Sequence, residues 1–219
     1  MARVAIPTLF TRTGRGRAEP DKDSPTSMQS GGILLSDIAS RSARRFWWGA
    51  LGTLPAAAAL MTFVLALYTL LVFFGNVTDF GTNLEFVRHV LAMDTTFHDP
   101  ALAYRAITNP ALQEAVYIGV IAWEGLTTVV LVGAVAQWLP AFRGTSGFDR
   151  ARRSTTVGLL MLIALFAGGF IVIGGEWFAM WQSTQWNGLQ PALQNTILAA
   201  FALLLVHLPA RQWEAGEAT

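Results

Sequence analysis

Residues 112–138 have the sequence LQEAVYIGVIAWEGLTTVVLVGAVAQW, which is apolar apart from a few isolated polar side chains. A helix needs about 20 predominantly apolar residues to cross the hydrocarbon core of a bilayer. Residues 47–75, 154–174 and 192–208 form three further apolar stretches of comparable length. The sequence therefore predicts an all-α membrane protein, folded as a bundle of four transmembrane helices.

The composition agrees with a place in the lipid bilayer. Hydrophobic residues make up 53% of the chain and charged residues 13%, whereas soluble domains have about 25% charged residues. The chain has no cysteine, which excludes disulfides, thiolate metal ligands and thiol redox chemistry. The formal net charge of +1 gives no reason to expect a nucleic-acid partner. No metal-ligand or cofactor motif stands out, so we expect a protein without a metal or cofactor, and not an enzyme.

The positive charges are unevenly distributed between the two sides of the predicted spans. Of the 15 Lys and Arg residues, only Arg88 and Arg105 fall between the first and second spans or between the third and fourth. Short connections that are rich in Lys and Arg remain on the cytoplasmic side. We therefore expect both termini in the cytoplasm and two loops, 76–111 and 175–191, on the outer side.

The chain divides into three expected segments. Residues 1–40 are predicted to form a disordered cytoplasmic tail, because residues 1–30 combine Gly, Ser, Pro and Arg with almost no apolar periodicity. Residues 41–210 form the transmembrane domain and 211–219 a cytoplasmic tail. Met28 is an alternative start of translation. Arg44 and Arg45 before an apolar run also fit a twin-arginine export signal, but the length of the run and the three spans after it favour a membrane anchor.

The first outer loop contains a second periodic pattern. Apolar and charged residues alternate at helical spacing over 83–93, which predicts a short amphipathic helix in the interface or over the mouth of the bundle. Thr82 and Glu85 have the spacing of a capping box for that helix. Asn109 followed by Pro110 predicts the N-cap and first residue of the second span.

Two patterns bear on how the spans pack. Pro55 lies about one turn inside the predicted first span, which indicates a modest kink. Small residues at four-residue spacing, such as Ala115 with Gly119 and Ala164 with Gly168, allow helices to approach closely. These pairs favour a packed bundle over four independent anchors.

Glu124 is the charged residue that lies deepest in a predicted span. At ~1.5 Å per residue it is roughly 15 Å below the outer boundary, where a carboxylate costs on the order of 2.5–3.5 kcal/mol on insertion scales. Tyr68 lies at a similar depth, and Thr127 and Thr128 are one turn away. We expect a structural contact of Glu124 with Tyr68 or a Thr. A proton or ligand site and a water-lined cavity remain the alternatives.

Aromatic and acidic residues gather in the two outer loops and form a candidate recognition surface. Trp177 and Trp181 are four residues apart, which predicts a shared helical face. Such a surface suits a cationic or sugar-like ligand, whereas anchoring of tryptophans at the headgroup level is the simpler explanation. The histidine spacings match no metal-ligand motif. The candidate residues are His89, Asp94, Glu176, Trp177, Trp181, Trp186 and Asn187.

The same loops contain the strings FVRHVLAMDTTF at 86–97 and GGEWFAMWQS at 174–183, followed by WNG at 186–188. These strings resemble the bacterial family of predicted small integral membrane proteins, which is catalogued as a domain of unknown function. The resemblance covers about residues 46–208. It implies four helices with both strings on one side of the bacterial inner membrane, and no reaction, substrate or cofactor. The family usually continues after the last string with Ala-Phe-Arg, whereas this chain has Leu189-Gln190-Pro191.

Three hypotheses of function follow. The first is a non-enzymatic membrane protein whose outer loops form a recognition surface for a membrane-protein partner or for a second copy of the chain, beside its contact with the lipid bilayer. The second is a small transporter or proton-linked protein in which Glu124 titrates. The third is an accessory subunit that contacts quinone or lipid, for which the sequence offers only its apolarity.

Overall fold

A computed structural model describes residues 52–214. The expectations for residues 1–40, Met28, Arg44 and Arg45 lie outside this range. Within it, four helical segments are long and apolar enough to cross a membrane, which confirms the all-α, four-span fold. They are α2 (Leu54–Thr78), α4 (Pro110–Phe142), α5 (Phe148–Ile163) with its continuation η2 (Ala164–Trp177), and α6 (Leu189–His207).

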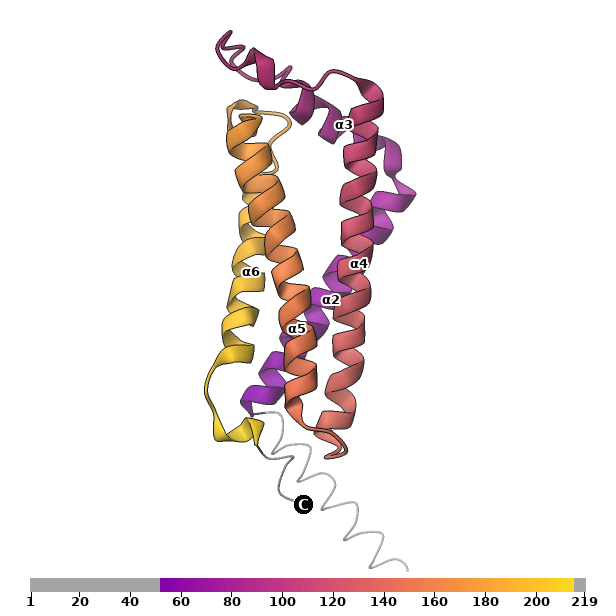
Figure 1. The fold of residues 1–219 in the computed structure, drawn as a ribbon, viewed down its shortest axis with the longest axis vertical. Helices are drawn as coiled ribbons and strands as arrows, with labels where there is room; N and C mark the ends of the chain where they lie inside the picture. The colour runs from indigo at the N-terminus through magenta and orange to yellow at the C-terminus, as the bar shows by residue number, and fades with distance from the viewer. Residues whose placement is uncertain (1–51, 215–219) are drawn as a thin grey trace, which may run out of the picture. The chain divides into compact units, whose positions relative to one another are not determined.

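The spans form one antiparallel bundle. Helix α2 packs against α4, α4 against α5, α5 against α6, and α6 against both η2 and α2. Figure 1 shows the short helix α3 (Phe80–Ala92) and the 178–188 turn at one end of the bundle, and the 143–147 turn at the other. We call residues 79–109 and 176–188 the cap. We call residues 143–153 and 208–214 the arginine end, because they include Arg143, Arg150, Arg152, Arg153 and Arg211.

The helix starts follow local capping rules. Asn109 accepts hydrogen bonds from the amides of Ala111 and Leu112, with Pro110 as the first helical residue, so the predicted start of the second span is confirmed. Thr53 caps α2 and accepts from the Ala56 amide at 3.4 Å. Pro55 therefore lies in the first turn of α2, where its missing amide removes no helical hydrogen bond. The predicted kink at Pro55 is wrong for this reason.

The glycines that bring helices together differ from those we expected. A Cβ atom at Gly158 of α5 would collide with the side chain of Leu131 of α4, and a Cβ at Gly125 would lie 2.9 Å from the ring of Phe73. The contact at Gly158 favours glycine most strongly, because Leu131 is fully buried and has no room to move. Gly119 and Gly168 would meet no atom within 4 Å, so the predicted packing role of these two glycines is wrong.

The third span changes its winding halfway. From Ala164 to Trp177 it is a π-helix of 14 residues, and in its last hydrogen bond the Phe178 amide donates to the Ile173 carbonyl at 3.0 Å. π-Helices are rare in proteins, and those that occur often lie at functional sites. Where the winding changes, the Met161 carbonyl accepts a hydrogen bond from the Trp123 indole of α4 at 3.0 Å.

The amphipathic helix of the first long loop is present, but it begins earlier than predicted. Helix α3 starts at Phe80 and ends at Ala92, and its C-cap Met93 has the left-handed φ of 54°. Its N-cap is Asp79, so Thr82 lies inside the first turn and the predicted capping box is wrong. Leu84 and Leu91 are buried beneath it, and α3 packs on α4 and α2.

Candidate functional site

The cap is one hydrogen-bonded unit made from two segments far apart in the sequence. The Phe97 amide donates to Gln182 Oε1 at 2.8 Å, and Thr95 donates to Ser183 Oγ at 2.9 Å. The Ile107 amide donates to the Leu91 carbonyl at 2.8 Å, which folds the loop back onto α3. Sequence analysis did not single out these polar residues, because each forms its bond only after the two segments meet.

His89 connects two of the other predicted residues. Its Nδ1 lies 2.8 Å from Asp94 Oδ2, and its ring stacks on Trp186 with the centroids 4.5 Å apart and the planes 13° apart. The Asp94 carboxylate orients the imidazole, and Trp186 covers one face of it. This group fastens the end of α3 to the 178–188 segment.

Two pairs of aromatic rings stand exposed on the cap. Phe97 meets Trp181 edge to face at 5.8 Å, and Tyr104 meets Trp177 in the same way at 6.4 Å. All four side chains are about half exposed or more, with Phe97 at 71% and Trp181 at 50%. Trp177 ends η2, and Ala179 has a φ of 52°, so the chain turns between Trp177 and Trp181. The predicted shared face of these two tryptophans is therefore wrong, since each belongs to a different pair.

Arg105, Glu176 and Asn187 complete the cap. The Arg105 guanidinium lies 4.8 Å from the centroid of the Trp177 ring, and one of its nitrogens donates to the Trp177 carbonyl at 3.3 Å. Glu176 is exposed, and among residues 52–214 neither it nor Arg105 forms an ion pair. Asn187 accepts from the Leu189 amide at 3.1 Å and so fixes the start of α6.

Glu124 is bonded to a residue that sequence analysis did not propose. Its Oε2 accepts a hydrogen bond from Asn76 Nδ2 at 2.7 Å, and Tyr117 donates to the Asn76 carbonyl at 3.1 Å. Tyr68 instead accepts from Asn195 Nδ2 at 2.7 Å. The expected bond of Glu124 to Tyr68 is therefore wrong. Glu124 faces Asn76 at the end of α2, whereas Tyr68 faces Asn195 of α6.

The two threonines near Glu124 do not bind it either. Thr127 donates to the Trp123 carbonyl of its own helix at 2.7 Å. Thr128 Oγ1 is buried and has no hydrogen-bond partner in the described part of the chain. The four predicted intramembrane residues thus do not form one hydrogen-bonded group.

The pairing with Asn76 also changes the level at which Glu124 lies. Asn76 is in the last turn of α2, which ends at Thr78. Helix α4 begins at Pro110, well beyond that level, and continues along α3 into the cap. Glu124 is therefore level with the cap-side end of α2, although it lies midway along α4, where the neighbouring Trp123 bonds to Met161 about halfway along the third span.

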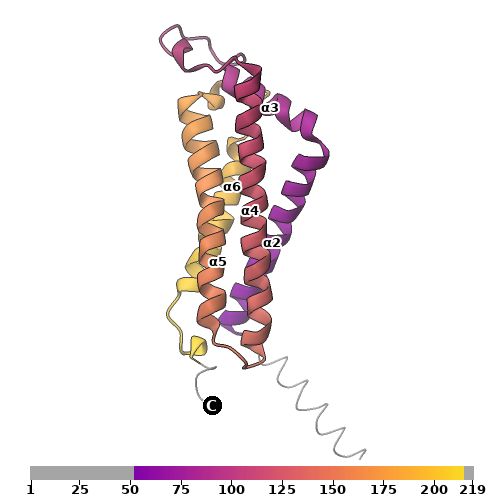
Figure 2. The ribbon, with the colours of Figure 1, turned by 45° about the vertical axis from the view of Figure 1, so that its right-hand side comes forward.

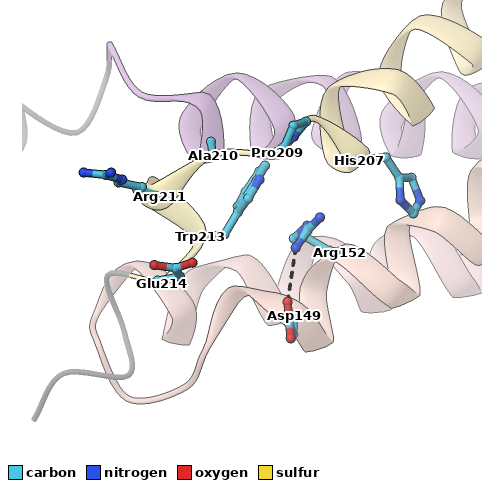
Figure 3. A pocket seen from close by; sticks show the side chains of 8 residues that line it. All are labelled: Asp149, Arg152, His207, Pro209, Ala210, Arg211, Trp213 and Glu214. Atoms are coloured by element: carbon cyan, nitrogen blue, oxygen red, sulfur yellow. Dashed lines mark hydrogen bonds and ion pairs between the residues drawn. The ribbon is translucent and has the colours of Figure 1, made fainter.

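A second open site lies at the arginine end, shown in Figure 3. Arg152 Nε donates to the Val206 carbonyl at 2.8 Å, and its guanidinium lies 4.5 Å from the centroid of the Trp213 ring and 3.2 Å from Asp149. Arg152 thus satisfies a carbonyl at the end of α6 and fastens the last turn to α5. The cleft measures about 700 Å³ and is lined by Asp149, Arg152, His207, Pro209, Ala210, Arg211, Trp213 and Glu214.

Four apolar spans, with an ordered and hydrogen-bonded cap at one end, define a multi-pass integral membrane protein. The chain belongs to the family described as "Predicted small integral membrane protein (DUF2165)", whose model matches residues 54–209. No curated protein and no solved structure matches the chain. The match begins where α2 begins and ends just after α6, so the family unit is the four-helix bundle together with its cap. The resemblance seen in the sequence is confirmed.

Proposed function

We propose that this protein is a non-enzymatic binding protein of the bacterial inner membrane, and that its cap is a recognition surface for another membrane protein or for a second copy of the chain. The exposed aromatic pairs Phe97–Trp181 and Tyr104–Trp177 are the observation on which the proposal rests. Membrane anchoring requires rings at the headgroup level, but it does not require them to be locked edge to face.

The cap is organised before any partner arrives. Hydrogen bonds from Phe97 to Gln182 and from Thr95 to Ser183 hold the loop that presents the rings. A surface that is already ordered loses less conformational entropy on binding, and aromatic anchors supply much of the binding energy at interfaces. The exposed carboxylate of Glu176, which forms no ion pair within residues 52–214, adds a charge at the edge of this surface.

The distribution of charge supports an outward-facing cap. The arginine end has five arginines, whereas the cap has Arg88 and Arg105. Because arginines in short connections stay in the cytoplasm, both termini are assigned to the cytoplasmic side. A cysteine placed at Gly144 should react with a membrane-impermeant maleimide only after the cells are opened. A cysteine placed at Asp99 should already react in intact spheroplasts. The reverse pattern would contradict the orientation.

A photoreactive amino acid in place of Trp181 tests the recognition surface in native membranes. A bound partner should give one discrete adduct, and its mass separates a second copy from a different protein. The matched control is the same amino acid at Val129, an exposed position in the middle of α4, which should give no discrete protein adduct.

The adduct must also depend on the ring geometry. Replacement of Phe97 by Ala removes the ring that orients position 181 and should reduce the adduct on the order of tenfold, as expected when an interface anchor worth about 1.4 kcal/mol is lost. An adduct of equal yield from positions 181 and 129, or an adduct that is indifferent to Phe97, would contradict the proposal.

The proton-linked alternative rests on the buried carboxyl group of Glu124, which accepts a hydrogen bond from the Asn76 amide. In Glu124→Gln the side-chain carbonyl still accepts from Asn76, so a purely structural acid should leave abundance and thermal stability nearly unchanged. A proton carrier should instead lose proton-coupled flux in vesicles at normal abundance.

A further inference from the structure

An apolar cleft opens between α4 and η2, beneath α3. Helices α4 and α5 pack closely, but α4 and η2 are not among the closely packed pairs within residues 52–214, and Figure 1 shows them diverging toward the cap. The cleft has a volume of about 240 Å³ and is roofed by α3. Its walls include Phe86, Val90, Val116, Val120, Gly169 and Phe170.

The widened winding of η2 and a glycine leave this space unfilled. Gly169 faces the cleft, and a Cβ added there would lie 3.8 Å from the nearest atom, the Leu165 side chain. The lining offers almost no polar group to hold water. Apolar cavities of about 150 Å³ already stay dry and take up hydrocarbon. The space is therefore suited to a hydrocarbon guest.

The mouth of the cleft is continuous with the lipid-facing surface of the spans. Val116 and Ile173 line the cleft, and their side chains are 42% and 52% exposed. Leu112 and Val172, which are exposed nearby, extend this surface along α4 and η2. The bilayer that surrounds the helices thus supplies acyl chains directly at the opening.

Charged groups lie where the headgroup of such a lipid would be. Ile173 and Phe178 line both the cleft and an adjoining groove that contains Glu176 and Trp177. Arg105 lies against the Trp177 ring. A zwitterionic headgroup matches this pattern, since its phosphate suits the Arg105 guanidinium, which forms no ion pair within residues 52–214, and its ammonium suits the carboxylate beside an aromatic face.

We propose that the cleft between α4 and η2 is a binding site for one acyl chain of a zwitterionic phospholipid, phosphatidylethanolamine, whose phosphate is held by Arg105 and whose ammonium is held by Glu176. The site lies beside the exposed rings of the cap and does not depend on the cap having a protein partner. It gives the protein a lipid ligand in addition to the general lipid contact of its spans.

Phosphatidylethanolamine with a photoreactive diazirine in its acyl chain, reconstituted with the full-length protein, tests the chain site. Peptide mapping should place the label on residues 116–120 and 169–173. Gly169→Leu should lower this label on the order of tenfold, the change expected when about 1.4 kcal/mol of binding is lost. The control, Gly168→Leu, makes the same substitution one residue away, where an added Cβ meets nothing within 4 Å, and should retain the label.

A second variant keeps the test valid if Gly169→Leu misfolds. Val116→Phe closes the mouth from an exposed position on α4 and should lower the label in the same way while the helical circular dichroism stays unchanged. Label spread over exposed positions such as Leu126 and Val129, with no effect of Gly169→Leu or Val116→Phe, would overturn the proposal. It would then indicate an empty cleft or one covered by a protein helix.

The headgroup assignment has its own measurement. Competition with unlabelled phosphatidylethanolamine should displace the label better than phosphatidylglycerol with the same chains. Glu176→Gln should abolish this preference, and Arg105→Gln should weaken the binding of both lipids. Arg143→Gln at the arginine end is the control and should change neither. A preference for phosphatidylglycerol in the unchanged protein would overturn the zwitterionic assignment.

Discussion

The two halves of the bundle are built in different ways. Toward the arginine end the four helices touch closely, with Gly158 of α5 against Leu131 of α4, and a hydrogen bond links the buried Trp138 indole to Thr155. Toward the cap, α4 and η2 separate, as Figure 1 shows. In the turned view of Figure 2, the cap-side end of α2 also leans away from α5 and η2. The space between them is an apolar cleft instead of a core.

We expect the difference to separate stability from recognition. The arginine half pairs buried polar groups, such as Thr62 with Thr155, and packs large side chains into its core, so we expect it to supply most of the folding free energy. The cap half uses local hydrogen bonds and exposed rings, which leaves surfaces and space available for ligands. Substitutions in the first half should therefore change global stability, and those in the second should change local order or binding.

The largest effect is expected at the glycine crossing. Gly158→Val forces a side chain into Leu131 and should destabilise the protein by about 3 kcal/mol, the upper end for overpacking a core. Equilibrium unfolding in mixed dodecyl sulfate micelles measures this. Gly133→Val on α4 is the matched control, because a Cβ there meets nothing within 4 Å. Equal losses for both variants would show that helix propensity, and not packing, sets the effect.

A somewhat smaller effect is expected from the buried hydrogen bond between α4 and α5. Thr155→Val keeps the shape of the side chain but leaves the Trp138 indole without its acceptor, which costs about 2 kcal/mol. Thr127→Val removes a hydroxyl that is equally buried but bonds only to its own helix, and should cost about 0.5 kcal/mol. The same unfolding titration compares them. Similar costs would mean that the interhelical bond contributes nothing specific.

Arg152 should matter less, because part of its side chain is in solvent. Arg152→Gln removes the bond to the Val206 carbonyl and the contact with the Trp213 ring, for a loss of about 1.5 kcal/mol. Amide hydrogen exchange at Trp213 and Glu214, whose amides bond within the last turn, should accelerate in this variant. Arg153→Gln changes an exposed neighbour and should leave both quantities unaltered.

The smallest global effect is expected in the cap. Ser183→Ala removes the acceptor for Thr95 and for the amides of Gln185 and Trp186, yet should change global stability by less than about 0.5 kcal/mol. Amide hydrogen exchange at residues 94–98 and 184–187 should accelerate on the order of tenfold. Thr184→Ala, an exposed neighbour, is the control. A loss of global stability in Ser183→Ala would erase the contrast between the two halves.

Much of the fold could be predicted because the bilayer imposes simple rules. The lengths of the apolar runs gave the four spans, and Asn109 with Pro110 gave a helix start to the residue. The candidate site was predicted less well. Among the residues selected in the two loops, His89 contacts Asp94 and Trp186, while the role of the group as a site stays a prediction. Their pairing was missed, because it depends on the turn at Ala179.

The partner of Glu124 was missed for a related reason. Depth was judged separately along each helix, and on that scale Asn76 lies at a boundary while Glu124 lies inside. The structure extends α4 past the end of α2, which brings the two side chains to 2.7 Å. The relative shift of two helices along their axes depends on contacts such as Gly125 against Phe73, and such contacts leave no periodic signal in either helix.

The amino-acid sequence alone determined that the chain is a four-span membrane protein with an amphipathic helix in one long loop, because hydropathy and charge act on each segment independently. Only the tertiary structure decided which polar side chains meet, where the π-helix opens the cleft, and which rings of the cap form pairs. These features depend on distances between segments that are far apart in the chain, and a one-dimensional pattern does not contain those distances.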